Sequence, residues 1–177
     1  MKIRTRHRVA RGGGANALSK SIRELSGNHK VKVGFPSNSK PYPDTGTSVI
    51  KVALWNEMGT RKRDGRVHIP ARPFLRPAIR ENRNKYIAMN RTNLPLVLHG
   101  KLTTHQALSQ LGAVAVGDVQ KKIVAIKEPP KSDATMRGYE REGHGDKTNP
   151  LIKTGHMRQS VTHEVVIPKV ASIGRAA

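Results

Sequence analysis

The chain has 177 residues, the size of one ordinary domain, and its 33 lysines and arginines against 12 aspartates and glutamates give a formal net charge of +21. Aromatic residues make up only 3% of the chain and cysteine is absent, which predicts an aliphatic core and excludes disulfides and cysteine-based zinc sites. The apolar runs are far shorter than the roughly 20 residues that span a bilayer, and no apolar signal core follows the basic first residues, so we expect a soluble, non-exported protein without membrane contact.

The chain begins with a basic arm. Residues 1–14 carry Arg4, Arg6 and Arg8 and end in three consecutive glycines. A segment of this composition has too little apolar surface to fold by itself. We therefore predict that residues 1–14 form a flexible tail, or an arm that orders only on assembly.

Two helices and a strand are predicted in the next part of the chain. Leucine and isoleucine recur at helical spacing over Ala15–Leu25, and a clean apolar alternation predicts a half-buried strand over His29–Phe35. After a loop rich in Ser, Pro and Asp, Thr47 or Ser48 can cap a helix that ends at about Met58. We place on the inner side of this helix Val49, Val52, Ala53 and Trp55.

A basic loop and a proline-rich stretch follow this helix. The loop places four cations around an Asp-Gly pair: Arg61, Lys62, Arg63 and Arg66. The stretch Ile69–Ala78 reads I-P-A-R-P-F-L-R-P-A, and its prolines fix φ at about −65° and favour extended residues before them. Such a stiff segment is suited to docking on a neighbour, or it is the entry into a helix that begins near Pro73 or Pro77.

Two further helices are predicted beyond the proline-rich stretch. A polar, Arg-rich helix should run from Pro77 to about Thr92 and break at Leu94–Pro95. The most regular apolar pattern in the chain predicts a long central helix over Thr103–Ile126, capped by one of the two threonines at its start. Its apolar stripe consists of Leu108, Leu111, Ala115, Val119, Ile123 and Ile126.

The last part of the chain combines an irregular segment with an ordered end. Residues 128–149 lack periodicity and are rich in proline, glycine and charge, so we predict a long loop that is functional or disordered. A turn at Lys153–Gly155, a helical turn over His156–Gln159 and a final strand over Ser160–Ile167 follow.

The predicted elements form one domain without an internal repeat. We place this domain at residues 15–168, between the arm and a short tail at 169–177. Its predicted class is α+β, with a small, mostly antiparallel sheet packed against a long amphipathic helix and shorter helices.

No group of residues indicates catalysis. The eight histidines are scattered, and none pairs with a cysteine. Pro43-Asp44 resembles the start of a metal-nuclease signature, but no acidic residue has a lysine two positions later to complete it. The chain also lacks G-x-S-x-G and a phosphate-binding glycine-rich loop with its lysine. We therefore expect a protein that is not an enzyme and that needs no cofactor and no metal.

The charge favours a polyanionic or acidic partner. An excess of positive charge this large destabilises a compact monomer by self-repulsion, and nucleic acid is its most frequent partner. The chain has no zinc-finger spacing and too few aromatic residues for a base-stacking surface, so nucleic acid would be contacted through its phosphates. One hypothesis is therefore a sequence-independent nucleic-acid-binding basic protein.

Three stretches in a fixed order resemble a family of phage morphogenesis proteins. They are W-N-E-M-G-T at 55–60, the proline-rich stretch at 69–78, and P-L-I-K-T-G-H-M-R-Q-S-V at 150–161. The predicted strand V-K-V-G-F, and the segments L-G at 111–112 and G-D-V-Q at 117–120 of the long helix, also resemble this family. From Leu18 to Val166 the chain is similar to the tail completion, or head–tail joining, proteins of tailed bacteriophages, which are related to the minor tail protein Z of lambda-type phages. One departure is Lys153, which stands where the family usually has aspartate. The salt bridge that an aspartate would make from this position is therefore not expected to be the same in this chain.

The resemblance implies a structural protein of the virion without catalysis. Its expected role is to complete the tail, or join tail to head, as a ring in the neck or at the top of the tail. It would assemble in the host cytoplasm. The implied partners are further copies of itself in the ring, the connector or adaptor, the tail terminator or tail tube, and phage DNA through its phosphates.

Two groups of residues are candidate contact sites under this interpretation. The candidate interface consists of Arg72, Pro73, Phe74, Leu75, Arg76, Thr154, Gly155 and Arg158. The candidate lining of a DNA channel, or contact to an acidic partner, consists of Arg4, Arg6, Arg8, Arg61, Lys62, Arg63 and Arg66. The alternatives are an intramolecular role for Phe74, a structural turn at Thr154–Gly155, and a solvated face for the cations.

Overall fold

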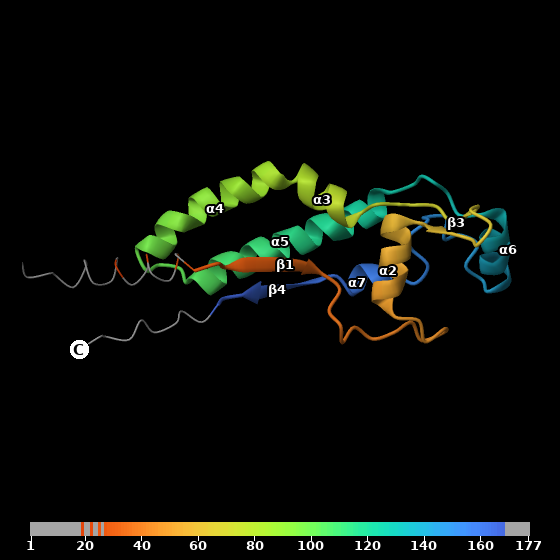
Figure 1. Ribbon diagram of the computed structural model, residues 1–177, viewed down its shortest axis with the longest axis horizontal. Coiled ribbons are helices and arrows are strands. Elements are labelled where there is room, and N and C mark those ends of the chain that lie inside the picture. Colours follow the sequence, from red (N-terminus) through yellow and green to blue (C-terminus); the bar gives the residue numbers. More distant parts are fainter. Residues whose placement is uncertain (1–18, 20–21, 23–24, 26, 169–177) are drawn as a thin grey trace, which may run out of the picture.

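The long central helix is α5, Thr104–Ala125, and the other elements pack around it (Figure 1). The computed structural model of the chain describes residues 19, 22, 25 and 27–168. The arm at 1–14 with Arg4, Arg6 and Arg8, and the tail at 169–177, lie outside the described residues. Most of the helix predicted over 15–25 also lies outside them, although Ser19, Ile22 and Leu25 are helical.

Helix α5 begins and ends almost where its pattern predicts. The Thr103 hydroxyl accepts a hydrogen bond from the Gln106 N–H at 3.1 Å, and the Gln106 side chain accepts one from the Thr103 N–H at 2.9 Å. This reciprocal capping box satisfies two N–H groups that the helix leaves free. Ala115, Val119 and Ile123 of the predicted stripe are buried, so α5 is the core helix.

A two-stranded antiparallel sheet packs on α5. Strands β1 (Lys30–Gly34) and β4 (Thr162–Val166) pair along their whole length, in the positions that their alternation predicts. His163 of β4 lies directly over Gly112 of α5, where a Cβ atom would overlap the imidazole ring. Glycine at this position therefore lets the sheet approach the helix closely.

Helices α3 (Leu75–Glu81) and α4 (Arg83–Leu98) run along a different side of α5 (Figure 1). The predicted break at Leu94–Pro95 is wrong, because α4 continues through Pro95. Proline removes only its own N–H bond and the ring is accommodated near the helix end, while the Pro95 carbonyl still accepts from the His99 N–H at 3.0 Å.

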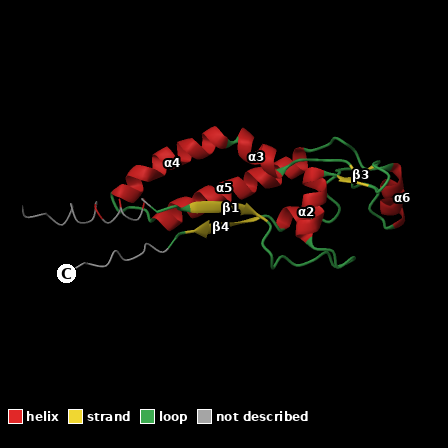
Figure 2. Cartoon of the chain, in the orientation of Figure 1, coloured by secondary structure: helices red, strands yellow, loops and turns green. Residues whose placement is uncertain are grey.

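The remaining elements gather beside and beyond the C-terminal end of α5, as Figures 1 and 2 show. They are α2 (Val49–Met58), β2 (Thr60–Arg61), β3 (Val67–Ile69), α6 (Asp133–Arg141) and α7 (His156–Gln159). Strands β2 and β3 form a short antiparallel hairpin where a basic loop is predicted. A backbone turn at the Asp64-Gly65 pair closes it.

The segment 128–149 is more ordered than its composition predicts. It contains α6, and the residue before that helix, Ser132, is its N-cap, whose hydroxyl accepts from the Thr135 N–H at 3.3 Å. An acid in the first turn and Arg141 in the last turn suit the helix dipole, so short-range charge placement stabilises a helix that apolar periodicity does not reveal.

The hydrophobic core joins segments from the whole described chain. Phe74, Ile123, Val49 and Val119 are its largest fully buried side chains. The prediction of one α+β domain with a small antiparallel sheet on a long helix is confirmed, although the described strands form two separate two-stranded sheets, of which β1–β4 packs on α5. In the described residues, no helix combines the length and apolarity that crossing a membrane requires.

Candidate functional site

The proline-rich stretch is held by the end of α2. The Glu57 carboxylate accepts hydrogen bonds from the backbone N–H groups of Phe74 at 2.7 Å, Leu75 at 2.9 Å and Arg76 at 3.1 Å. These groups belong to the first turn of α3, where N–H groups have no partner within the helix and negative charge is favoured. Glu57 therefore caps α3 from another helix.

The same part of α2 fixes the residues before Phe74. The Arg72 N–H donates to the Asn56 carbonyl at 2.6 Å. Gly59, which ends α2 with φ of +74°, lies so close to the stretch that a Cβ would come within 2.9 Å of the Ala71 nitrogen. Only glycine fits both requirements, so the W-N-E-M-G-T and proline-rich motifs form one interlocked unit.

Arg72 joins this unit to the segment that follows α5. Its Nε and Nη2 donate to the carbonyls of Pro129 and Pro130, both at 2.6 Å. The residue is only 6% exposed, and burial lowers the pKa of the guanidinium below its ordinary value. The prediction that Arg72 forms the polar rim of an interface is therefore corrected, because two backbone carbonyls of its own chain hold it inside.

Phe74 is also an internal residue. Its side chain is 1% exposed and packs edge-to-face on Phe35, with ring centroids 6.2 Å apart. The prediction that Phe74 anchors a neighbouring subunit is corrected in favour of the intramolecular alternative. Leu75 packs partly against the same core, and among the candidates at 72–76 only Pro73 and Arg76 are exposed.

The third motif closes the core from the C-terminal side. Asn149, the residue just before this motif, donates to the carbonyls of Val124 and Ile126 at the end of α5, at 2.9 and 3.3 Å. Leu151 and Met157 then enter the cluster that contains Phe74. The three stretches that carry the phage resemblance thus meet in one packed unit.

The candidate residues of this motif have mixed positions. Gly155 is buried with φ of +81° and starts α7, while the Thr154 hydroxyl accepts weakly from the His156 N–H at 3.4 Å. The Arg158 side chain is exposed, although its carbonyl accepts from Gln120 at 3.2 Å. Thr154 and Gly155 therefore have the structural role of the alternative prediction, and Arg158 stays available at the surface.

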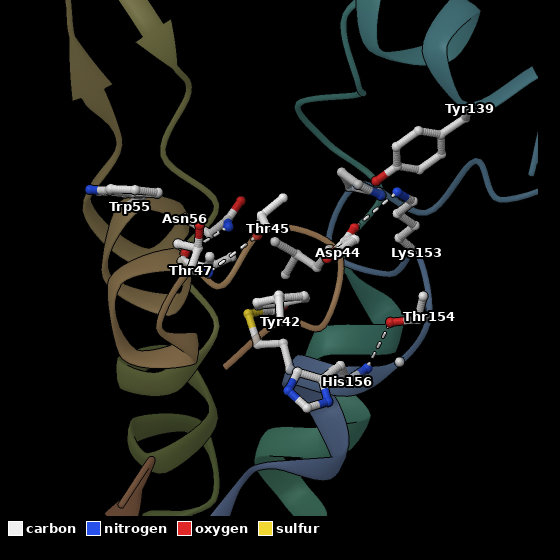
Figure 3. Close-up of a pocket in the computed structure, with 15 residues that line it drawn as sticks. Tyr42, Asp44, Thr45, Thr47, Trp55, Asn56, Tyr139, Lys153, Thr154 and His156 are labelled. Carbon is white, nitrogen blue, oxygen red and sulfur yellow. Dashed lines mark hydrogen bonds and ion pairs between the residues drawn. The ribbon is translucent and has the colours of Figure 1, made fainter. Parts of the chain in front are cut away.

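A pocket of about 310 Å³ lies between α2, α6 and the turn before α7 (Figure 3). Tyr42, Trp55 and Tyr139 contribute its aromatic walls. Lys153 pairs there with Asp44 at 3.3 Å and with Glu142 at 2.6 Å, and the bond to Glu142 raises the pKa of Lys153. Lys153 thus pairs with carboxylates, whereas an aspartate at this position would pair with a cation. Its ammonium group is engaged within the fold.

The exposed cations of the β2–β3 hairpin form a second feature. Arg66 pairs with Asp64 at 3.5 Å, and Arg61 donates to the Gly65 carbonyl at 3.1 Å. Lys62 and Arg63 have exposed side chains without an ion pair among the described residues. The hairpin therefore presents charge that phosphates or carboxylates can bind.

The outer side of α2 does not follow from the sequence prediction. Trp55, predicted to face inward, is exposed, and so are Ile50, Leu54 and Met58, which recur at intervals of four residues. The recurrence was visible in the sequence. Val49 and Ala53 match the same helical spacing and take the core side, so the pattern alone did not show which apolar row faces outward.

Comparison of the chain with protein-family models, curated proteins and solved structures gives no match. Within the described residues, no three His, Asp or Glu side chains lie together as metal ligands. The resemblance to the phage family therefore rests on the sequence motifs alone.

Proposed function

We propose that the chain is a structural protein of a tailed-phage virion that completes the tail or joins it to the head. The observation that supports this proposal is the convergence of the three resembling stretches. Residues 55–60 cap and hold residues 69–78, and Leu151 and Met157 of the third stretch belong to the same core cluster as Phe74. Because the three stretches are held together in one packed unit, they support this proposal more than three separate short matches would.

In this role the protein works by contact and not by chemistry. Its interlocked motifs keep the end of the molecule rigid, so that neighbours can bind exposed groups with little ordering cost. The exposed groups of the candidate sites among the described residues are Pro73, Arg76, Thr154, Arg158 and the hairpin cations. The proposed partners are further copies in a ring, the connector or adaptor, and the tail terminator or tube.

The test is to image particles assembled with and without this chain. Without it we expect filled heads and separate tails, and purified protein added back should restore joined particles. A variant that removes an exposed candidate, Arg158→Glu, should be tested beside the wild type for the same restoration. Complete virions that form without the chain would reject the proposal.

A second candidate is sequence-independent nucleic-acid binding, which the hairpin cations favour. Arg61, Lys62, Arg63 and Arg66 lie within one exposed turn, in a chain of net charge +21. Binding of unrelated DNA duplexes should then be equal and should weaken steeply with salt, because counterions are released from the phosphates. Replacing Lys62 and Arg63 by serine should reduce the salt dependence by about two phosphate contacts.

A further inference from the structure

The solvent side of α2 is almost entirely apolar. Leu54 is 57% exposed, Met58 56%, and Ile50 and Trp55 38% each. Lys51 is the one charged residue on this side, because Glu57 is turned towards α3. A helix at the surface of an isolated domain normally carries polar residues on its outer side. This helix therefore has apolar residues where solvent would favour polar ones.

The apolar surface continues onto the hairpin. Val67 of β3 is 57% exposed, and it lines, with Met58, Ile69 and Ala71, a hollow of about 410 Å³ between α2 and the hairpin. We call Ile50, Leu54, Trp55, Met58 and Val67 the α2 face. It combines a ridge of residues four apart with a hollow at its end, and such a ridge fits between the side-chain rows of another helix.

Cations flank the ridge of the α2 face. Lys51 lies beside the ridge, between Met58 and Trp55 in helical spacing, Arg76 approaches Met58 with Nη2 at 3.6 Å from the sulfur, and Arg61 lines the hollow. The nearby carboxylates are engaged, since Glu57 accepts three backbone N–H groups and Asp64 pairs with Arg66. A ligand of this face therefore meets apolar side chains along the ridge and positive charge beside it.

We propose that the α2 face docks an acidic amphipathic helix of another protein. The apolar stripe of the partner helix would cover Ile50, Leu54 and Met58, and one large side chain of that helix would enter the hollow. Carboxylates that flank the stripe would pair with Lys51 and Arg76. Two copies of this chain joined through the same face would bring like charges together, which disfavours a symmetric dimer. This inference rests on exposure and charge alone, so it does not depend on the proposed function.

The test uses two synthetic peptides and the full chain labelled for NMR. Both peptides form amphipathic helices with leucine at positions a and d, and the stripe is flanked by glutamate in one and by lysine in the other. The acidic peptide should perturb the resonances of the α2 face, and its affinity should fall as salt rises. The basic peptide should bind at least about tenfold more weakly.

Matched variants locate the contact. Leu54→Glu should weaken binding of the acidic peptide by about tenfold or more, and Met58→Gln by less, because both change the ridge. The control Leu96→Glu changes an apolar residue of α4 that is 38% exposed and should leave the affinity unchanged. Thermal unfolding of each variant checks its fold, and Met58→Gln carries the test if Leu54→Glu fails to fold.

Three results would overturn the inference. The acidic peptide could fail to perturb the α2 face, the basic peptide could bind equally well, or Leu96→Glu could weaken binding as much as Leu54→Glu. Self-association that Leu54→Glu abolishes would assign the face to a second copy instead. None of these results concerns the joining of heads and tails, which the particle images test separately.

Discussion

Single residues hold the proline-rich stretch in place. One carboxylate, that of Glu57, satisfies three N–H groups, and one guanidinium, that of Arg72, satisfies two carbonyls. Such charge-assisted hydrogen bonds to backbone groups are stronger than neutral ones. A buried N–H or carbonyl group that is left without a hydrogen bond destabilises the fold. These residues look like binding groups in the sequence, but they bind the chain itself.

Phe74→Ala should lower the free energy of unfolding by about 3–5 kcal/mol, because it empties a fully buried site that the surrounding backbone keeps open. Urea unfolding of the isolated protein measures the change. The matched control is Leu54→Ala, whose side chain is 57% exposed and whose effect should stay within about 0.5–1 kcal/mol. A small loss for Phe74→Ala would return this residue to the candidate interface.

Tyr42 should make the fold sensitive to alkali. Burial raises the pKa of Tyr42 to about 12, with smaller effects of Tyr139 and Asp44. A raised pKa means that the fold favours the neutral phenol, so this stability is present below the ordinary pKa of about 10 and is lost as pH rises towards 12. In Tyr42→Phe, the free energy of unfolding should fall less between about pH 9 and about pH 11.5 than in the wild type. Equal falls in the two proteins would contradict the assignment.

At the scale of elements, the segment with α6 depends on tertiary anchors. Arg72 holds its beginning, and the Lys131 ammonium donates to the carbonyls of Lys147 and Ile152 near its end. The same ammonium lies 4.1 Å from the Tyr139 ring centroid. A segment with few buried apolar contacts is ordered mainly by such bonds, so its local stability follows the anchors.

Arg72→Met should increase cleavage of residues 128–147 by a protease of broad specificity. The variant keeps much of the side-chain volume but removes both donors to Pro129 and Pro130, which frees the start of the segment. Limited proteolysis with mass spectrometry identifies the sites. Arg76→Met, which changes an exposed arginine in the same stretch, is the control and should be cleaved like the wild type. Unchanged cleavage in Arg72→Met would show that the two bonds do not hold the segment.

At the scale of the whole molecule, charge opposes self-association. The chain has a formal net charge of +21. In the described part, most acidic residues already pair with lysines or arginines or cap a helix. Repulsion between like surfaces must be overcome by partners that supply negative charge. The proposed ring in a virion, with acidic proteins or DNA as neighbours, would meet this requirement.

The isolated protein should therefore be monomeric at physiological salt and form a ring only on its partners. Sedimentation velocity over a range of protein concentrations measures the size. Added salt at about 0.5 M screens the repulsion, so any weak association should increase and not decrease there. A stable ring of the isolated protein would contradict this prediction and would show that its own contacts suffice.

Local patterns were enough to predict much of the fold. Helix α5, the strands β1 and β4 and the short helix α7 follow from spacing and capping, because these act between residues a few positions apart. The convergence of the motifs, the burial of Phe74 and the exposure of the α2 face could not be predicted in this way. Glu57 and Phe74 are 17 positions apart and Arg72 and Pro129 57 positions apart, so only the packing of distant segments decided them. An arginine or an aromatic residue suits a surface and a core equally until the neighbours that cover it are known.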